Sequence, residues 1–87
     1  MKDQDAEIKK KIKDFIIETF MFGQGSLRDD EPLFASGIID SLGFIKLLAF
    51  IQETFHVLIE MNEVTMEKFN TPNDIAGIIM AKSGKTP

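Results

Sequence analysis

Residues 41–55 have the sequence SLGFIKLLAFIQETF, which predicts an α-helix with apolar side chains on two faces. At about 100° of rotation per residue, one narrow arc of this helix must face a core. That arc contains Phe44, Leu47, Leu48, Ile51 and Phe55. A second, largely opposite arc contains Leu42, Ile45 and Ala49, flanked by Lys46 and Glu53. A helix on the surface of a small bundle needs only one apolar stripe, so the second stripe predicts a contact surface for a partner.

The segment before this helix predicts another helix and a long loop. Residues 4 to 21 carry an apolar stripe at helical spacing, made of Ile8, Ile12, Phe15, Ile16 and Phe20. Glycines after this stripe end the helix and begin a loop that extends to about Ile39. Leu33 and Phe34 are the apolar residues expected to anchor the loop to the bundle.

The C-terminal part predicts a connector, a short helix and a last helix. Residues 55–61 alternate weakly and are expected to be extended, and a short helical turn is expected around Val64 to Phe69. Thr71 suits the N-cap of the last helix and Pro72 its first position, and the helix should end near Ser83. The whole pattern predicts an all-α fold, a four-helix bundle with a long loop between its first two helices and a short third helix.

Length and composition limit the class of protein. The 87 residues predict one domain over residues 1–87, with a core from about 4 to 82 and a flexible tail at 83–87. The chain has no cysteine, which excludes disulfides and thiolate metal sites. A net charge of −4 argues against nucleic-acid binding, and the longest apolar run, 47–51, is too short to span a membrane. The charged N-terminus lacks the apolar stretch of a signal peptide, so we expect a cytoplasmic protein.

The charges are unevenly distributed along the chain. Residues 29–74 contain nine acids and two bases, for a local charge of −7, whereas the rest of the chain carries +3. Such a concentrated negative field attracts basic partner surfaces. Its expected sources outside the second helix are Asp29, Asp30, Glu31, Asp40, Glu60, Glu63 and Glu67. The simpler interpretation is that these charges only keep the protein soluble.

No arrangement of residues in the chain predicts an active site. His56 is the single histidine, and a lone histidine in a connector is typical of a surface residue. The Gly23-Gln24-Gly25 run is too short for a phosphate-binding loop and follows a helix instead of a strand. The acids lack the spacing of a calcium-binding loop. We therefore predict no metal site and no enzymatic activity, and expect a substrate or a binding module for other proteins.

Residues 31–42, EPLFASGIIDSL, place Ser41 at the joint between the long loop and the second helix. The start of a helix offers unpaired backbone N–H groups and the positive end of the helix dipole. A phosphodiester attached to the Ser41 hydroxyl would be favoured there by up to about 1 kcal/mol. The simpler interpretation is that Asp40 or Ser41 only caps the helix.

The complete string resembles the acyl and peptidyl carrier protein family. Residues 37–42, GIIDSL, match the family's Gly-x-x-Asp-Ser-Leu run, in which the serine carries phosphopantetheine. Leu33 and Phe34 match its loop anchor, and residues 65–72 and 73–75 resemble its third helix and the start of its last helix. The likeness covers residues 8 to 80, which is nearly the whole chain.

The resemblance implies that Ser41 carries a swinging 4′-phosphopantetheine arm, which holds an acyl or aminoacyl cargo as a thioester. The arm supplies the thiol that the chain itself lacks. The implied partners of this monomeric carrier are a phosphopantetheinyl transferase, an acyl- or aminoacyl-activating ligase and acyl-transferring enzymes, and the implied role lies in fatty acid or secondary metabolite biosynthesis. Asp40 is then a recognition or metal-adjacent acid, a role that is compatible with capping. The implied partner surface consists of Leu42, Ile45, Lys46, Ala49, Glu63 and Glu67.

Two departures from the family pattern narrow this expectation. Gly43 and Lys46 stand where carriers of fatty acid synthesis typically have acids, and the 14-residue spacing from Phe55 to Phe69 is more like that of aminoacyl and peptidyl carriers. We therefore expect a specialised discrete carrier instead of the housekeeping fatty acid carrier. The alternative, from a different class, is an unmodified helical module that docks partners through Leu42, Ile45 and Ala49.

Overall fold

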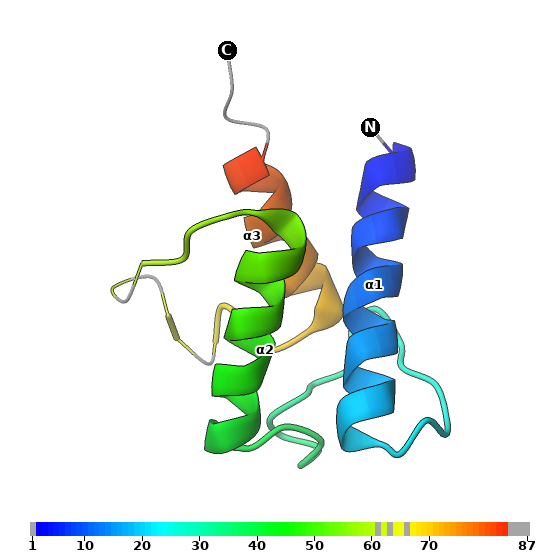
Figure 1. Ribbon diagram of the computed structural model, residues 1–87. Helices are drawn as coiled ribbons and strands as arrows, with labels where there is room; N and C mark the ends of the chain where they lie inside the picture. The colour runs from blue at the N-terminus through cyan, green and yellow to red at the C-terminus, as the bar shows by residue number, and fades with distance from the viewer. Residues whose placement is uncertain (1, 61, 63, 66, 84–87) are drawn as a thin grey trace.

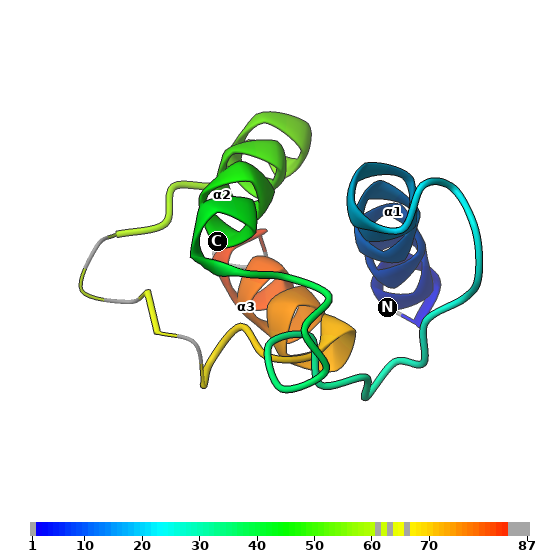
Figure 2. The same cartoon turned by 90° about the horizontal axis from the view of Figure 1, so that it is seen from below.

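The computed structural model describes residues 2–60, 62, 64–65 and 67–83. Within this part of the chain it is all-helical, with α1 at Lys2–Phe20, α2 at Ser41–Phe55 and α3 at Pro72–Ser83 (Figure 1). Helix α1 runs in one direction, and α2 and α3 run in the opposite one, so the end of α1 and the start of α2 lie at the same end of the bundle. Seen from below, the three helices form a triangle with the long loop crossing beneath it (Figure 2). None of the described helices combines the length and hydropathy that a bilayer span requires.

The helix boundaries follow the local signals in the sequence closely. Helix α2 has the predicted bounds, and α1 begins two residues before the predicted start and ends one residue before the predicted end. Helix α3 begins at Pro72, as predicted, because the Thr71 hydroxyl accepts a hydrogen bond from the Asp74 N–H at 3.0 Å. The all-α prediction is therefore confirmed.

The predicted four-helix arrangement is not confirmed, because the segment around Val64 to Phe69 contains no α-helix among its described residues. A single turn at 67–69 is present instead. The Thr65 hydroxyl accepts a hydrogen bond from the Lys68 N–H at 3.1 Å, which is the bond that an N-cap makes. The expected partner residue Glu63 and most of the expected tail, residues 84–87, lie outside the described residues.

The core is formed by side chains from all three helices and from both connections. Its fully enclosed members are apolar: Ile12, Ile16, Leu33, Leu47, Ile51, Phe69, Ile75, Ala76 and Ile79. Phe44 is also buried, and its ring meets the rings of Phe34 and Phe69 edge-on at 5.2 and 5.5 Å. Two members of the predicted buried arc of α2, Leu48 and Phe55, are only half-buried and pack at the edge of the core; Phe55 is the last residue of the helix.

The long loop is fixed to the helices at several points along its length. Leu33 is buried as predicted, its N–H donates to the Asn70 carbonyl at 2.7 Å, and Phe34 is packed against the core. Asp29 connects three parts of the molecule. Its carboxylate accepts a hydrogen bond from Lys13 at 2.7 Å and lies 3.6 Å from Lys9, while its carbonyl accepts from the Asn73 N–H in α3 at 2.9 Å. The loop therefore cannot move without breaking contacts to α1 and α3.

These contacts predict a pH dependence of stability that depends on Asp29. The hydrogen bond from Lys13, together with the charge of Lys9, lowers the pKa of Asp29 below its ordinary value of 3.8. A lowered carboxylate pKa contributes stability above the ordinary value and loses it as the pH falls through the folded-state value. Asp29→Asn should therefore reduce the free energy of unfolding near neutral pH by up to about 1 kcal/mol, since the Asp29 side chain is about half exposed and solvent screens the pair. Urea titrations at several pH values would measure this difference.

Asp30→Asn is the matched control, because the ion pair that Asp30 makes within the described part of the chain is with Arg28 of its own loop, at 3.4 Å. The effect of Asp29→Asn should shrink toward zero in acid, whereas a penalty of the same size at acidic and neutral pH would contradict the assignment.

Candidate functional site

The site at the start of α2 is built on the capping contact of Asp40. This residue has an extended backbone, and its carboxylate oxygen Oδ1 accepts a hydrogen bond from the Gly43 N–H at 2.7 Å. Its carbonyl accepts the first helical bond, from the Phe44 N–H at 2.8 Å. Asp40 is thus the N-cap, and the simpler of the two roles considered for it is present in the structure.

Ser41 is the first residue of α2, and it is exposed. Its hydroxyl makes no hydrogen bond to any residue in the described part of the chain, since Asp40 performs the capping that a serine could otherwise do. The side chain therefore lies at the positive end of the helix with a free oxygen. A short, exposed hydroxyl of this kind fits a covalent phosphodiester, which needs an accessible oxygen and is favoured by the local field.

The loop before Ser41 explains why this side chain remains on the surface. Turns in this loop are closed by the N–H of Ser36 to the Pro32 carbonyl and by that of Gly37 to the Phe34 carbonyl, at 2.9 and 3.1 Å. Gly37 has a φ of 82°, a conformation that favours glycine. The turns lead into Ile39, which is buried, and the chain then rises to the surface at the next residue.

The outward arc of α2 is exposed as its angular position predicts. Leu42 and Ile45 expose 65% and 62% of their surface, and Ala49 is exposed one turn later. We refer to these three residues as the outer ridge. Lys46 and Glu67 are exposed as well, whereas contact of any of these residues with a partner stays a prediction.

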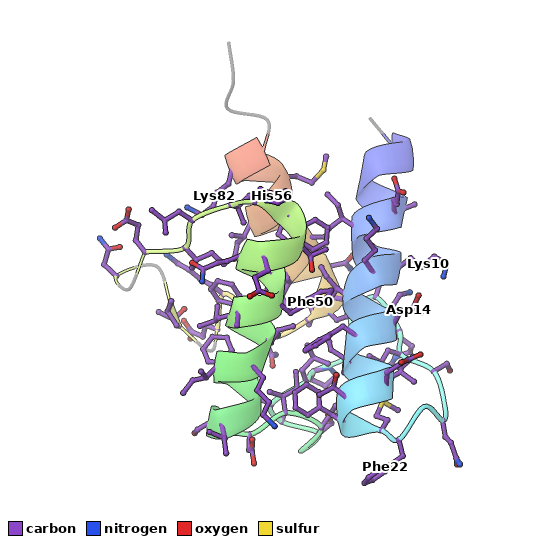
Figure 3. The ribbon with its side chains drawn as sticks, in the orientation of Figure 1. Lys10, Asp14, Phe22, Phe50, His56 and Lys82 are labelled. Carbon is purple, nitrogen blue, oxygen red and sulfur yellow. The ribbon has the colours of Figure 1, made fainter. Side chains whose placement is uncertain are left out.

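Two exposed apolar side chains were not identified by the sequence analysis. Phe22 exposes 90% of its surface and points away from the bundle at the end where α2 begins (Figure 3). Phe22 has a φ of 58° and lies between Met21 and Gly23, whose N–H groups both donate hydrogen bonds to the Ile17 carbonyl at the end of α1. Leu58 exposes 70%, and the alternation of the connector could have indicated this, because its neighbour Ile59 is buried.

The acidic field expected from the long loop is partly neutralised within the molecule. Asp29 is paired with Lys9 and Lys13, and Arg28 lies 3.4 Å from both Asp30 and Glu31. The acids of the loop are therefore weaker attractants for a basic partner than their number suggests.

The capping role of Asp40 leads to a stability prediction. Asp40→Ala should lower the free energy of unfolding by about 1 kcal/mol, because the Gly43 N–H loses its acceptor. Asp40→Asn is the control, since its amide oxygen can accept the same bond and should preserve most of the stability. Thermal and urea unfolding of both variants would measure this, and equal losses for Ala and Asn would contradict the capping role.

Comparison with known proteins connects this geometry to a family. The family model described as "Phosphopantetheine attachment site" matches residues 10–79. The chain is 31% identical over 74 residues to the D-alanyl carrier protein of Streptococcus suis (strain 05ZYH33), covering 84% of this chain and 92% of that protein. It is 34% identical over 70 residues to the D-alanyl carrier protein of Lactobacillus delbrueckii subsp. bulgaricus (strain ATCC BAA-365 / Lb-18), covering 79% and 85%.

These relatives are named as carriers of D-alanine, so the expected role in fatty acid or secondary metabolite biosynthesis is not supported. Members of the family are not catalytic, and their cofactor is a covalently attached 4′-phosphopantetheine group. The chain belongs to the phosphopantetheine-dependent carrier proteins.

Proposed function

We propose that Ser41 is the attachment residue for 4′-phosphopantetheine and that the protein carries a D-alanyl group as a thioester on this arm. The observation that carries the proposal is the exposed Ser41 hydroxyl at a helix start that Asp40 already caps. Two further points support the cargo. The relatives are named as D-alanyl carriers. The 14-residue spacing from Phe55 to Phe69 is more like that of aminoacyl and peptidyl carriers than that of the housekeeping fatty acid carrier.

The chemistry required of Ser41 is that of a phosphoryl acceptor. The serine oxygen attacks the pyrophosphate of coenzyme A at the phosphorus that bears the pantetheine, and a phosphodiester bond forms. The nucleoside phosphate part of coenzyme A leaves, the serine proton passes to a base of the transferase, and Mg²⁺ bound by the transferase neutralises charge on the phosphates. The thiol at the end of the arm then provides the atom that carries the aminoacyl group.

The outer ridge is proposed as the surface that docks the transferase, the activating ligase and the enzymes that receive the cargo. Its exposed side chains Leu42 and Ile45 lie on the same helix as Ser41, within its first five residues. Lys46 and Glu53 give α2 no net charge, so apolar contact is the main attraction that this helix offers. Glu63 and Glu67 are proposed as acidic contacts for the same partners.

We propose a single carrier domain with a core from about residue 4 to 82, which acts as a monomer in the cytoplasm, where coenzyme A supplies the arm. The family match over residues 10–79 supports one domain. The capped turn after Thr65 supports a short third helix at this point of the fold. A specialised carrier with a dedicated ligase fits a helix α2 that lacks acids in its first turn.

Attachment at Ser41 is tested by mass spectrometry. Incubation with coenzyme A, Mg²⁺ and a promiscuous phosphopantetheinyl transferase should add the mass of one 4′-phosphopantetheine group to the protein. Ser41→Ala should gain nothing, and Ser36→Ala should be modified normally, because Ser36 is an exposed serine in the preceding loop. An adduct on Ser41→Ala, or none on the native chain, would contradict the proposal and favour the unmodified docking module.

Docking through the outer ridge is tested on the protein that carries the arm. Ile45→Ser should raise the KM of a D-alanine-activating ligase for the carrier about fivefold or more, as removal of a central apolar contact does. Phe22→Ser makes the same change at an exposed apolar residue outside the ridge and should leave the KM close to the native value. Steady-state loading with radiolabelled D-alanine would measure both, and an unchanged KM for Ile45→Ser would contradict docking through the ridge.

A further inference from the structure

The end of α1 meets the start of α2 through one close contact, between the Phe20 ring and Gly43. Gly43 is buried although the two residues before it, Ser41 and Leu42, are exposed, and Phe20 is half-buried. A Cβ atom placed on Gly43 would lie 2.7 Å from Cε1 and 3.1 Å from Cζ of the Phe20 ring. Real Cβ atoms essentially never come closer than 3.0 Å to another atom, so any other residue at 43 would have to displace the ring.

The glycine at this position is explained by this close approach, not by its backbone conformation. Gly43 does not have a positive φ, in contrast to Gly37. A glycine within a helix costs about 1 kcal/mol relative to alanine, so the chain gives up helix stability here. Gly77 in α3 is a useful contrast, because a Cβ placed there would meet nothing within 4 Å.

Gly43 also belongs to the cap of α2. Its N–H donates to Asp40 Oδ1 at 2.7 Å, and a Cβ at this position would lie 3.2 Å from the same oxygen. Gly43 therefore both contacts the Phe20 ring and donates the hydrogen bond to the capping carboxylate of Asp40. Ser41 lies between Asp40 and Gly43 in the chain, so a shift of the Phe20 ring or of the Asp40 cap would also move the backbone of Ser41.

The Phe20 ring is itself held from the other side. It meets the Phe15 ring edge-on, with centroids 6.1 Å apart, and Phe15 stacks on Phe50 of α2 at 4.1 Å. Figure 3 shows Phe50 on the side of α2 that faces α1. Two contacts thus connect α1 to α2: Phe15 stacks on Phe50 in the middle of α2, and Phe20 lies against Gly43 in its first turn, next to Ser41.

We propose that Phe20 is a positioning residue for the modification of Ser41. Its ring rests on Gly43 and fixes the first turn of α2, with its Asp40 cap, against the end of α1. The backbone that carries the Ser41 hydroxyl is thereby held in one place for the transferase. This inference rests on the proposed function, because it assumes that Ser41 is the residue modified.

The first test is Gly43→Ala, assayed by the rate of 4′-phosphopantetheine transfer from coenzyme A. The kcat should fall between about tenfold and 100-fold, the range that a misplacement of about 1 Å produces. The KM for the carrier should change little, because the outer ridge is left intact. Gly77→Ala is the matched control, since it makes the same change in a helix at an open position, and its kcat and KM should both equal the native values.

The second test is a rescue. Phe20→Leu combined with Gly43→Ala provides room for the new methyl group and should recover most of the kcat that Gly43→Ala loses. Phe20→Ala alone removes the ring and should also lower kcat at an unchanged KM. Amide hydrogen exchange at position 43 gives an independent readout, because loss of the ring should speed exchange of the N–H that is bonded to Asp40.

The outcomes separate this inference from the proposed function. Native kcat and KM for Gly43→Ala, or a double variant no faster than Gly43→Ala, would overturn the positioning role while Ser41 is still modified in the native chain. A native chain that gains no adduct, or an adduct on Ser41→Ala, would overturn the proposed function itself. If circular dichroism shows that Gly43→Ala does not fold, the kcat measured for Phe20→Ala is the deciding result. A kcat equal to the native value would then overturn the inference.

Discussion

The hydrogen bond from the Gly43 N–H to the Asp40 carboxylate determines where α2 begins and what Ser41 is free to do. Serine is itself a good N-cap, and a helix that began one residue later would use its hydroxyl as an acceptor. Because Asp40 satisfies that first turn, the Ser41 oxygen is exposed and has no hydrogen-bond partner among the described residues. The aspartate beside the serine thus has a physical role in exposing the hydroxyl, whatever contact it makes with a transferase.

The contacts around this cap form a connected frame. Phe20 holds the first turn from the side of α1, and the buried Ile39 holds the loop that leads into it. Farther along the loop, Asp29 is bonded to Lys13 in α1 and to Asn73 in α3. Part of the charge asymmetry along the sequence is therefore internal pairing between the basic first helix and the acidic loop. The acids of the loop are therefore a smaller part of what a partner would meet than the exposed apolar side chains of the outer ridge.

The outer ridge combines apolar surface with neutral charge. Leu42 and Ile45 remain exposed in a chain whose other large apolar side chains are mostly enclosed, so the protein keeps surface that a partner can bury. Only a few side chains contribute, which suits a carrier that must release each partner after transfer. Phe22 and Leu58 extend the set of exposed apolar residues to the end of α1 and to the connector.

The helices, and the position of the serine at the start of α2, could be predicted from the order of residues, because both follow from local interactions. Helical spacing defined residues 41–55, the Thr71-Pro72 pair set the start of α3, and angular position alone placed Leu42 and Ile45 outside. Packing of the helices and the loop sets three further features: Phe55 is half-buried, Asp29 pairs with Lys13, and the Phe20 ring lies against Gly43. The short helix expected near Val64 is not confirmed among the described residues, and a segment of this length depends on packing for its stability. These contacts join residues far apart in the chain, and their geometry depends on how whole helices pack, which no local pattern specifies.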